Sequence, residues 1–452
     1  MGEDTTFRPL FRPSLQVQVT EQALSSFGGV VYLREFEERT RLLAPLIAAL
    51  EDGRDTRRIE HRPGEMLRLA VYGRMLGFPD VADADALRHD PVLRSALRPG
   101  AQDRVGERLA AKSTLHRFLT RTLCERKNRR EVAEAVLRTG LAPVLARGAL
   151  PSRLYVDLDS TVIEAHGAQQ GARNNGYFRA VCYHPLVASL GEWGTTLGFL
   201  LRPGNVHTAR HARSFVLPLL RRMRAILGPK VELVLRADSG FSDPSLMAAL
   251  EQEGFYFLVR LRENARLLCK AERIAKRRPG RPAEGRSVFR RFAFTYRAKG
   301  WASARRVLAR AEFEPGTLFP DWTFLCVHLP TRERHRHVSR AYFRRGSSEQ
   351  INDVFKNELR GDLMSHRRLR RNQVRGLLTA LAQNLLVAFD HATGPRRRRR
   401  RPATLRTRIL IVATSLVRHA RRLVLRLAAV GHQAALLART AQRIFALRPA
   451  PA

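Results

Sequence analysis

The stretch from residue 151 to residue 254 most strongly limits how this chain can fold, because strand and helix signals alternate along it. Its strands alternate polar and apolar residues, and its helices carry apolar residues at three- and four-residue spacing. Four residues between the second and third strands have the length of a hairpin turn. The expected elements are strands at 153–162, 181–190, 195–201 and 231–237, and helices at 209–227 and 243–253. This order is typical of an α/β fold with a mixed sheet.

The chain changes character on either side of this stretch. Residues 1–150 predict mostly helix, with segments at 38–50, 64–76 and 112–119, and Ser113 or Thr114 as a cap of the last. Residues 255–340 are β-rich around a basic Pro/Gly loop at 276–282, and their strands are expected at 255–261, 287–296, 304–313 and 321–329. Helix patterns return at 346–389. Residues 391–452 hold 15 Arg and no acidic residue; the run Arg396–Arg401 opens a stretch expected to continue as basic amphipathic helix.

The overall charge is strongly positive. The 452 residues contain 81 Lys and Arg against 41 Asp and Glu, a formal net charge of +40. So much positive charge needs a polyanion close by, nucleic acid first and an anionic membrane surface second. A hydrophobic content of 44% with 22 Phe argues against a disordered chain.

The cysteines and the chain's first residues indicate the compartment. Four widely separated cysteines without a Cys-x-x-Cys pair argue against a disulfide scaffold or a cysteine zinc site, and favour a reducing cytoplasm. The first residues lack the basic and apolar regions of a secretory signal. No window approaches ~18 apolar residues, so we expect no membrane span.

Three acidic residues lie at the ends of elements expected to pack together. Asp159 lies on the first strand, Asp238 follows the strand at 231–237, and Glu349 lies on the helix after the β-rich segment. Three carboxylates without Cys or His are hard oxygen ligands of the kind that Mg²⁺ prefers. Two such ions can activate a nucleophile and stabilise the leaving oxygen of a phosphodiester. One such acid alone would more often be a structural, hydrogen-bonded residue, so the indication comes from the set.

The helix that carries Glu349 strengthens this interpretation. Tyr342, Arg345, Glu349 and Lys356 point within roughly 60° of one another on a regular helix. One polar stripe therefore places a metal-binding carboxylate between an arginine and a lysine suited to phosphates, with a tyrosine hydroxyl beside them. An ordinary solvated helix face would explain why these residues are charged, but not their order along the helix beside the two upstream aspartates.

These residues carry a resemblance to a known group of proteins. Tyr342-x₂-Arg345-x₃-Glu349-x₆-Lys356 resembles the Tyr-Arg-Glu-Lys signature of bacterial insertion-sequence transposases of the Asp-Asp-Glu type. Further motifs are similar to the thirteen-eighty family of insertion sequences within that group. They are Asp157-Leu158-Asp159-Ser160-Thr161, Gly167-Ala168-Gln169-Gln170-Gly171, Tyr183-His184-Pro185-Leu186, Leu201-Arg202-Pro203-Gly204-Asn205, Arg236-Ala237-Asp238-Ser239-Gly240-Phe241 and Arg345-Gly346-Ser347-Ser348-Glu349, with Arg88-His89-Asp90-Pro91 and Ser113-Thr114-Leu115-x-Arg117 before them.

The resemblance implies a ribonuclease-H-like core with a β insertion between the second Asp and the Glu. It implies DNA cleavage at transposon ends and joining of 3′ ends to a target. The implied cofactor is Mg²⁺, or Mn²⁺ in its place, as two ions held by Asp159, Asp238 and Glu349. Asp159 fits the family's first catalytic acid because Ser160-Thr161 follows it, and Asp157 on the same strand face is the fallback. One departure is Asn352-Asp353, where a more basic run is expected.

The resemblance also assigns regions and partners. We expect a helical DNA-binding region at 1–150, a catalytic core at 151–254 and 341–390, a β-rich insertion at 255–340 and an Arg-rich helical tail at 391–452. Tyr342, Arg345 and Lys356 would bind phosphates. Expected partners are the double-stranded DNA of transposon ends and target, and a second copy in a synaptic homodimer, with no membrane. The expected location is the bacterial cytoplasm, on the nucleoid.

Two other functions compete with an active transposase. A catalytically inactive relic would bind DNA ends without cutting them, and the intact set of acids argues against it. A membrane-surface protein would act through the basic C-terminal helices. That reading is weaker, because residues 391–452 offer only Phe445 as an interfacial aromatic.

Overall fold

The computed structural model describes residues 24–98, 108–275, 287–315, 319–331, 333–395, 399–419 and 422–450, together with Ser14, Gly285 and Thr317. The basic loop at 276–282 and Arg396 to Arg398, singled out in the sequence, lie outside these residues. In the described part no helix is both long and apolar enough to cross a membrane.

An eight-stranded mixed sheet forms the centre of the fold, as the alternating pattern from residue 151 predicts. Its order is β10-β11-β12-β9-β8-β2-β6-β7. β8 runs parallel to both β2 and β9, whereas the other neighbouring strands are antiparallel. The strands are β2 (Arg153–Ser160), β6 (Leu186–Leu190), β7 (Thr195–Leu200), β8 (Glu232–Ala237), β9 (Tyr256–Leu261), β10 (Val288–Tyr296), β11 (Arg305–Phe313) and β12 (Asp321–His328).

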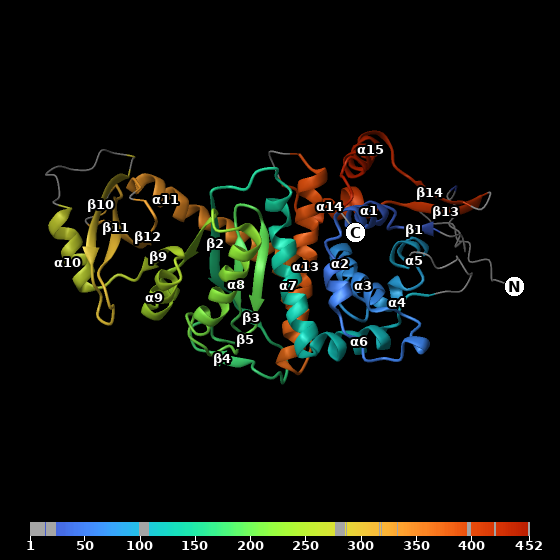
Figure 1. The fold of residues 1–452 in the computed structure, drawn as a ribbon, viewed down its shortest axis with the longest axis horizontal. Coiled ribbons are helices and arrows are strands. Elements are labelled where there is room, and N and C mark those ends of the chain that lie inside the picture. Colours follow the sequence, from blue (N-terminus) through green and yellow to red (C-terminus); the bar gives the residue numbers. More distant parts are fainter. Residues whose placement is uncertain are drawn as a thin grey trace.

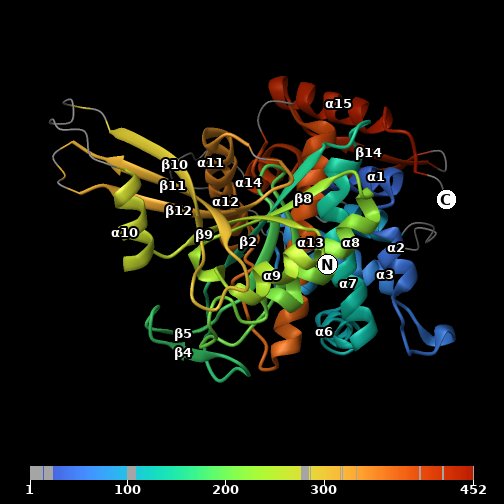
Figure 2. The same cartoon turned by 60° about the vertical axis from the view of Figure 1, so that its left-hand side comes forward.

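The β-rich segment at 255–340 forms no sheet of its own. Its strands lie where the sequence predicts them, but β9 pairs with β8 and β12 pairs with β9, so they continue the central sheet (Figure 2). Helix α10 (Ala265–Ile274) connects β9 to β10 within this segment. The β-rich segment expected at 255–340 therefore extends the central sheet.

The two faces of the sheet are covered by different helices. Leu154, Val156 and Leu158 of β2 pack in one apolar cluster with residues of α7 (Arg126–Leu145), α8 (Ala212–Leu227) and α9 (Pro244–Gln252). On the other face, Val338 and Tyr342 of α11 (His335–Phe343) pack with strands β8, β9, β11 and β12. Because side chains alternate along a strand, Asp157 and Asp159 lie on this second face.

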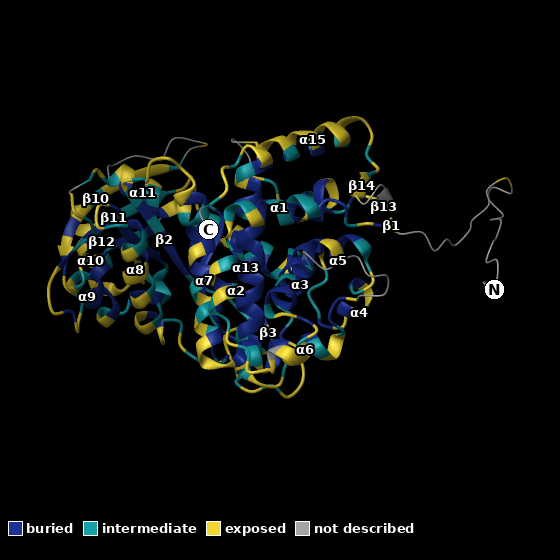
Figure 3. Cartoon of the chain, turned by 45° about the vertical axis from the view of Figure 1, so that its right-hand side comes forward, coloured by how far each residue is buried: buried dark blue, intermediate teal, exposed yellow. Residues whose placement is uncertain are grey.

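Helix α13 (Leu369–Thr393) is the long central helix, and it is buried along most of its length (Figure 3). It contacts α7 and β7 on the sheet side and α3 on the other side (Figure 1). The helices and turns of the N-terminal part are α1 (Val30–Thr40), α2 (Ala44–Ala49), η1 (Thr56–Arg58), α3 (Pro63–Leu76), α4 (Ala84–Leu87), α5 (Pro91–Leu97), α6 (Lys112–Thr120) and η2 (Thr122–Cys124).

Two details of the predicted N-terminal helices are wrong. The segment at 38–50 is broken, because α1 ends at Thr40 and Arg41 adopts a left-handed conformation with φ 51° before α2 begins. Helix α6 starts at Lys112, before both predicted caps, and its N-cap position, Ala111, makes no side-chain capping bond.

The Arg-rich tail is not helical throughout, which corrects that expectation. After α14 (Pro402–Leu405) and the π-turn η6 (Arg406–Leu410), strands β13 (Thr414–His419) and β14 (Arg422–Leu427) form a hairpin. β13 pairs with β1 (Leu24–Ser25), and α15 (Gly431–Phe445) packs on α13 and α1. The tail therefore closes against the beginning of the chain, since its alternating Leu, Val and Arg residues suit an edge hairpin.

A small three-stranded sheet lies beyond the end of β2. It has the order β3-β5-β4 and consists of β3 (Ile163–Glu164), β4 (Arg173–Asn175) and β5 (Ala180–Tyr183). The strand expected at 181–190 is thus two strands in two sheets, β5 and β6, separated at His184-Pro185.

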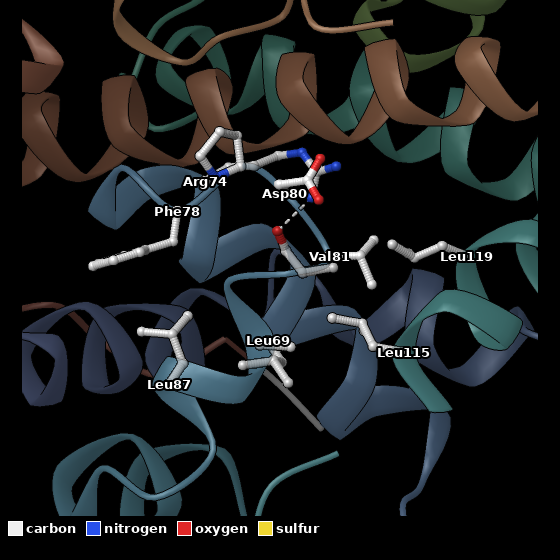
Figure 4. Close-up of a pocket in the computed structure, with 11 residues that line it drawn as sticks. Leu69, Arg74, Phe78, Asp80, Val81, Leu87, Leu115 and Leu119 are labelled. Atoms are coloured by element: carbon white, nitrogen blue, oxygen red, sulfur yellow. Dashed lines mark hydrogen bonds between the residues drawn. The ribbon is translucent and has the colours of Figure 1, made fainter. Parts of the chain in front are cut away.

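A pocket among the N-terminal helices encloses a charged residue. Leu69, Leu87 and Leu115 line it with Arg74 and Asp80 (Figure 4). Burial, and then the charge of Arg375 nearby, lower the pKa of Arg74 to about 9. The volume of about 10 Å³ holds no more than a water molecule, so this pocket is not a ligand site.

The buried amide of Asn384 on α13 joins three elements, and its loss should destabilise the fold. It accepts from the Thr196 N–H of β7 (2.8 Å) and donates to the carbonyls of Thr196 (2.7 Å) and Val136 on α7 (2.9 Å). Asn384→Leu removes the side-chain partner of the Thr196 N–H and carbonyl in a buried place, so we expect a loss on the order of 3 kcal/mol in denaturant unfolding. The exposed Gln442→Leu on α15 should change stability by less than about 0.5 kcal/mol. Equal effects of the two would contradict this role.

Candidate active site

Asp159 and Asp238 meet at one edge of the central sheet, as the sequence predicts. β2 and β8 are parallel neighbours in which Leu158 pairs with Ala237. Asp159 follows Leu158 and Asp238 follows Ala237, so the two acids lie next to each other. Asp238 continues β8 in an extended conformation, and its Oδ1 accepts the Gly240 N–H at 2.8 Å. A Cβ at Gly240 would lie 2.8 Å from Thr208 Cγ2 and 3.0 Å from that same Oδ1, so glycine permits the tight turn behind the carboxylate.

Asp157 lies on the same strand face as Asp159, but it is fully buried and paired with an arginine. Its two carboxylate oxygens accept from Arg236 Nε (2.6 Å) and Nη2 (2.8 Å), and both side chains are fully buried. The Gly191 N–H also points to Oδ2 at 3.3 Å. Burial raises the pKa of Asp157, with Arg236 acting in the opposite direction. Its oxygens are occupied, and this geometry favours Asp159 over the fallback as the functional acid.

Asp159 carries a negative charge in an unfavourable place. Its side chain is only 16% exposed, and burial raises its pKa to about 6. The carboxylates of Asp238 and Glu349 add to the rise, whereas Arg345 and the Ser160 N–H oppose it. A bound cation would stabilise the ionised form of Asp159, because nearby positive charge opposes the effects of burial and of neighbouring carboxylates.

Four residues on the segment after α11 act on Asp159. Arg345 Nη1 lies 3.8 Å from Asp159 Oδ1, and Asn352 donates to Oδ2 at 3.2 Å. Glu349 is exposed in the first turn of its helix, and Lys356 is half-buried, with its pKa lowered by burial against the charges of Asp362 and Asp159. Arg345 therefore lies beside the first acid, and the charges of Glu349 and Lys356 act on that acid from the same segment.

The segment is less regular than a single helix. It passes from α11 through the 3-10 turn η4 (Arg344–Gly346) and α12 (Ser347–Asp353) into the π-turn η5 (Val354–Glu358). Arg345 Nη1 is buried and has no hydrogen-bond partner among the described residues. A buried nitrogen without a hydrogen bond is costly, and this one lies 3.8 Å from Asp159 Oδ1, where an oxyanion beside that acid would accept from it.

Tyr342 takes a different position from the predicted one. It is buried, and its hydroxyl donates to the Ala237 carbonyl at 3.4 Å. In this arrangement Tyr342 anchors α11 to the end of β8 next to Asp238, and its hydroxyl faces the backbone rather than a phosphate.

Asn352 is a site residue that the sequence reasoning missed. It was noted only as a departure from a more basic run. Its position seven residues after Arg345 and three after Glu349 could have shown that it shares their face of the helix.

The donor set fits a hard divalent cation in part. Asp159 and Asp238 offer carboxylate oxygens, and neither is paired closely with a cation that would exclude a metal. Within the described ranges no group of three His, Cys, Asp or Glu residues stands close enough to hold a metal together. Coordination by all three acids would therefore require Glu349 to approach the aspartates.

The arginine run of the tail is partly engaged by the protein. Arg400 pairs with Asp390 at 2.6 Å, and Arg401 pairs with Asp353 and Glu358 on the segment that carries Glu349. These two residues of the run are therefore ion-paired within the protein.

Carboxylates beside arginine and lysine at a sheet edge are suited to phosphate-ester chemistry. The family described as transposase DDE domain group 1 matches residues 7–449, so the chain belongs to this family of transposases, enzymes of DNA transposition and recombination that use divalent metal ions. The piggyBac transposase synaptic complex with hairpin DNA, solved by cryo-EM, is similar with a TM-score of 0.40 and 10% identity, over 85% of this chain and 79% of that chain. No curated protein sequence matches this chain.

The two neighbouring aspartates should separate in stability measurements. Asp157→Asn leaves the buried Arg236 with only the longer ion pair to Glu192, at 3.7 Å, and should cost about 3–5 kcal/mol in denaturant unfolding. Asp159→Asn should not lower stability at pH 8 without divalent metal, because it removes a charge that the fold disfavours. Since the folded pKa is raised to about 6, this carboxylate reduces stability as pH rises from about 4 through 6. That slope should be shallower in Asp159→Asn. A loss as large as that of Asp157→Asn would mean that Asp159 is a structural anchor.

Proposed function

We propose that this protein is a DNA transposase that binds the terminal inverted repeats of an insertion sequence, cleaves DNA and transfers strands into a target. The observation that carries the proposal is the pair Asp159 and Asp238 at one sheet edge, with Arg345, Glu349 and Lys356 facing the first of them. Membership of the transposase family supports the reaction class. The thirteen-eighty family and the Tyr-Arg-Glu-Lys signature belong to the same proposal.

A ribonuclease-H-like core is part of this proposal. The order β7-β6-β2-β8-β9, with an antiparallel β7-β6-β2 half and parallel β2, β8 and β9, supports it. The first acid lies at the end of the central strand and the second at the end of its parallel neighbour.

Asp159, Asp238 and Glu349 would hold Mg²⁺ or Mn²⁺, which supplies activation of the attacking oxygen and stabilisation of the leaving oxygen. Arg345 and Lys356 bind oxygens of the phosphodiester next to these acids. Asn352 keeps Asp159 oriented through its hydrogen bond to Oδ2. Tyr342 positions α11 against β8, so that Arg345 stays beside the acids.

The partners follow from the reaction. Both transposon ends and the target are double-stranded DNA, and the net charge of +40 favours binding to their phosphates. We propose a homodimer in the synaptic complex, because two ends must be brought together before joining. A catalytically inactive DNA-binding relic is the competing function, and a nicking assay on DNA carrying the ends separates the two.

Glu349→Gln should abolish metal-dependent cleavage while binding of end DNA survives. An amide of the same size keeps the exposed position but loses the charge that would hold a cation. The measurement is nicking of labelled end DNA with Mg²⁺ or Mn²⁺, beside a gel-shift assay for binding.

Asp353→Asn is the matched control, since this acid lies on the same helix but pairs with Arg401 and Asn357. It should retain cleavage. Normal cleavage by a folded Glu349→Gln protein would remove Glu349 from the proposed set of ligands.

A further inference from the structure

A cavity of about 540 Å³ outside the candidate active site is lined by nine residues, six of which are arginine. It lies where α6, α7 and α13 come together, and no residue of the proposed acid set contributes to it. Its charged lining is Arg121, Arg126, Arg129, Arg368, Arg370, Arg371 and a single acid, Glu125.

Two long helices begin at this cavity. Glu125 is the N-cap position of α7, and Arg368 is that of α13. Neither helix has an acidic residue in its first turn or a side-chain cap. The ends of α7 and α13 that adjoin α6 lie side by side in Figure 1. Helix N-termini carry partial positive charge and unpaired N–H groups, so both helices add to the field of the arginines.

The arginines of this cavity are not neutralised as arginines elsewhere in the protein are. Arg222 and Arg138 share Glu134, and Arg221 pairs with Glu253. By contrast, Arg121, Arg126, Arg368 and Arg370 are exposed and form no ion pair with an acid among the described residues.

The two less exposed arginines of the cavity, Arg129 and Arg371, also form no ion pair with an acid in the described part of the chain. Arg129 donates to the Cys124 carbonyl at 2.8 Å, and the Nε of Arg371 is buried without a hydrogen-bond partner in the described part of the chain. Like charges gathered this closely repel one another, and a bound anion would offset the repulsion.

We propose that this cavity binds backbone phosphates of duplex DNA away from the reacting phosphodiester. Guanidinium groups clamp phosphate oxygens in pairs, and such contacts fix the position of a duplex without reading its sequence. Pockets for small ligands are mostly apolar and enclose their ligand, whereas four of these arginines are exposed to solvent. The choice of DNA rests on the proposed function. A small phosphorylated compound is the alternative outcome of the test.

The test removes two exposed arginines of the cavity, Arg368→Ala with Arg370→Ala, from the full chain. The matched control, Arg439→Ala with Arg448→Ala, removes the same charge from exposed positions on α15 and after it. Binding to a duplex of random sequence is measured by fluorescence anisotropy at several salt concentrations. Each lost phosphate contact changes the slope of log K against log salt by about 0.9, so the cavity variant should be flatter by about 2 and the control by much less.

A second variant separates charge from shape. Arg368→Lys with Arg370→Lys keeps both charges, so it should retain most of the slope while affinity falls through loss of bidentate contacts. Thermal unfolding of each variant shows whether it is folded.

An unchanged slope in a folded Arg368→Ala and Arg370→Ala protein overturns the proposal. It is also overturned if millimolar inorganic phosphate raises the melting temperature of the wild type but not of this variant, while duplex binding stays equal. Cleavage by the wild type is measured in parallel. Metal-dependent cleavage with an unchanged slope defeats only the cavity proposal, whereas a flatter slope without cleavage supports the cavity and defeats the proposed catalytic function.

Discussion

The buried ion pair of Asp157 and Arg236 is the interaction on which the candidate site depends. It joins β2 to its parallel neighbour β8, two residues before Asp159 on one strand and Asp238 after the other. Arg236 also donates to the Ala341 carbonyl of α11 at 2.5 Å, so the same guanidinium ties down the helix that precedes Arg345. Both side chains are buried, so the loss of either one would leave the other as a buried charge without its closest counter-charge. Three elements are thereby held together just beneath the acids.

The neighbouring acids on β2 illustrate how position divides structural from functional carboxylates. Asp157 has each oxygen occupied by Arg236, whereas Asp159 has a buried carboxylate with Arg345 no nearer than 3.8 Å and other acids close by. The charge of Asp159 is therefore unfavourable in the fold, whereas the charge of Asp157 is compensated by Arg236. Strained electrostatics of this kind are concentrated at functional sites, where a ligand relieves them.

The positive charge of the chain is similarly divided. Some arginines stabilise the fold through acids, as Arg400 does with Asp390 and Arg401 with Asp353 and Glu358. Others gather without such partners at the beginnings of α7 and α13. Net charge alone cannot distinguish these two uses, because each depends on which acid the tertiary structure brings within reach. Helix α13 links them, since it begins at the arginine cavity and ends near the paired run.

The sequence by itself determined the local elements and the order of the acids along the chain. Periodicity depends on near neighbours, so the strands from β8 to β12 and the helix at 209–227 were predictable from the sequence. Only tertiary structure decided that β9 to β12 continue the central sheet, that residues 414–427 form a hairpin, and that Asn352 bonds to Asp159. It also separated Asp157 from Asp159, which a period of two places on one face. Their difference is the arginine opposite Asp157 on β8, a partner 79 residues away that no local pattern reveals.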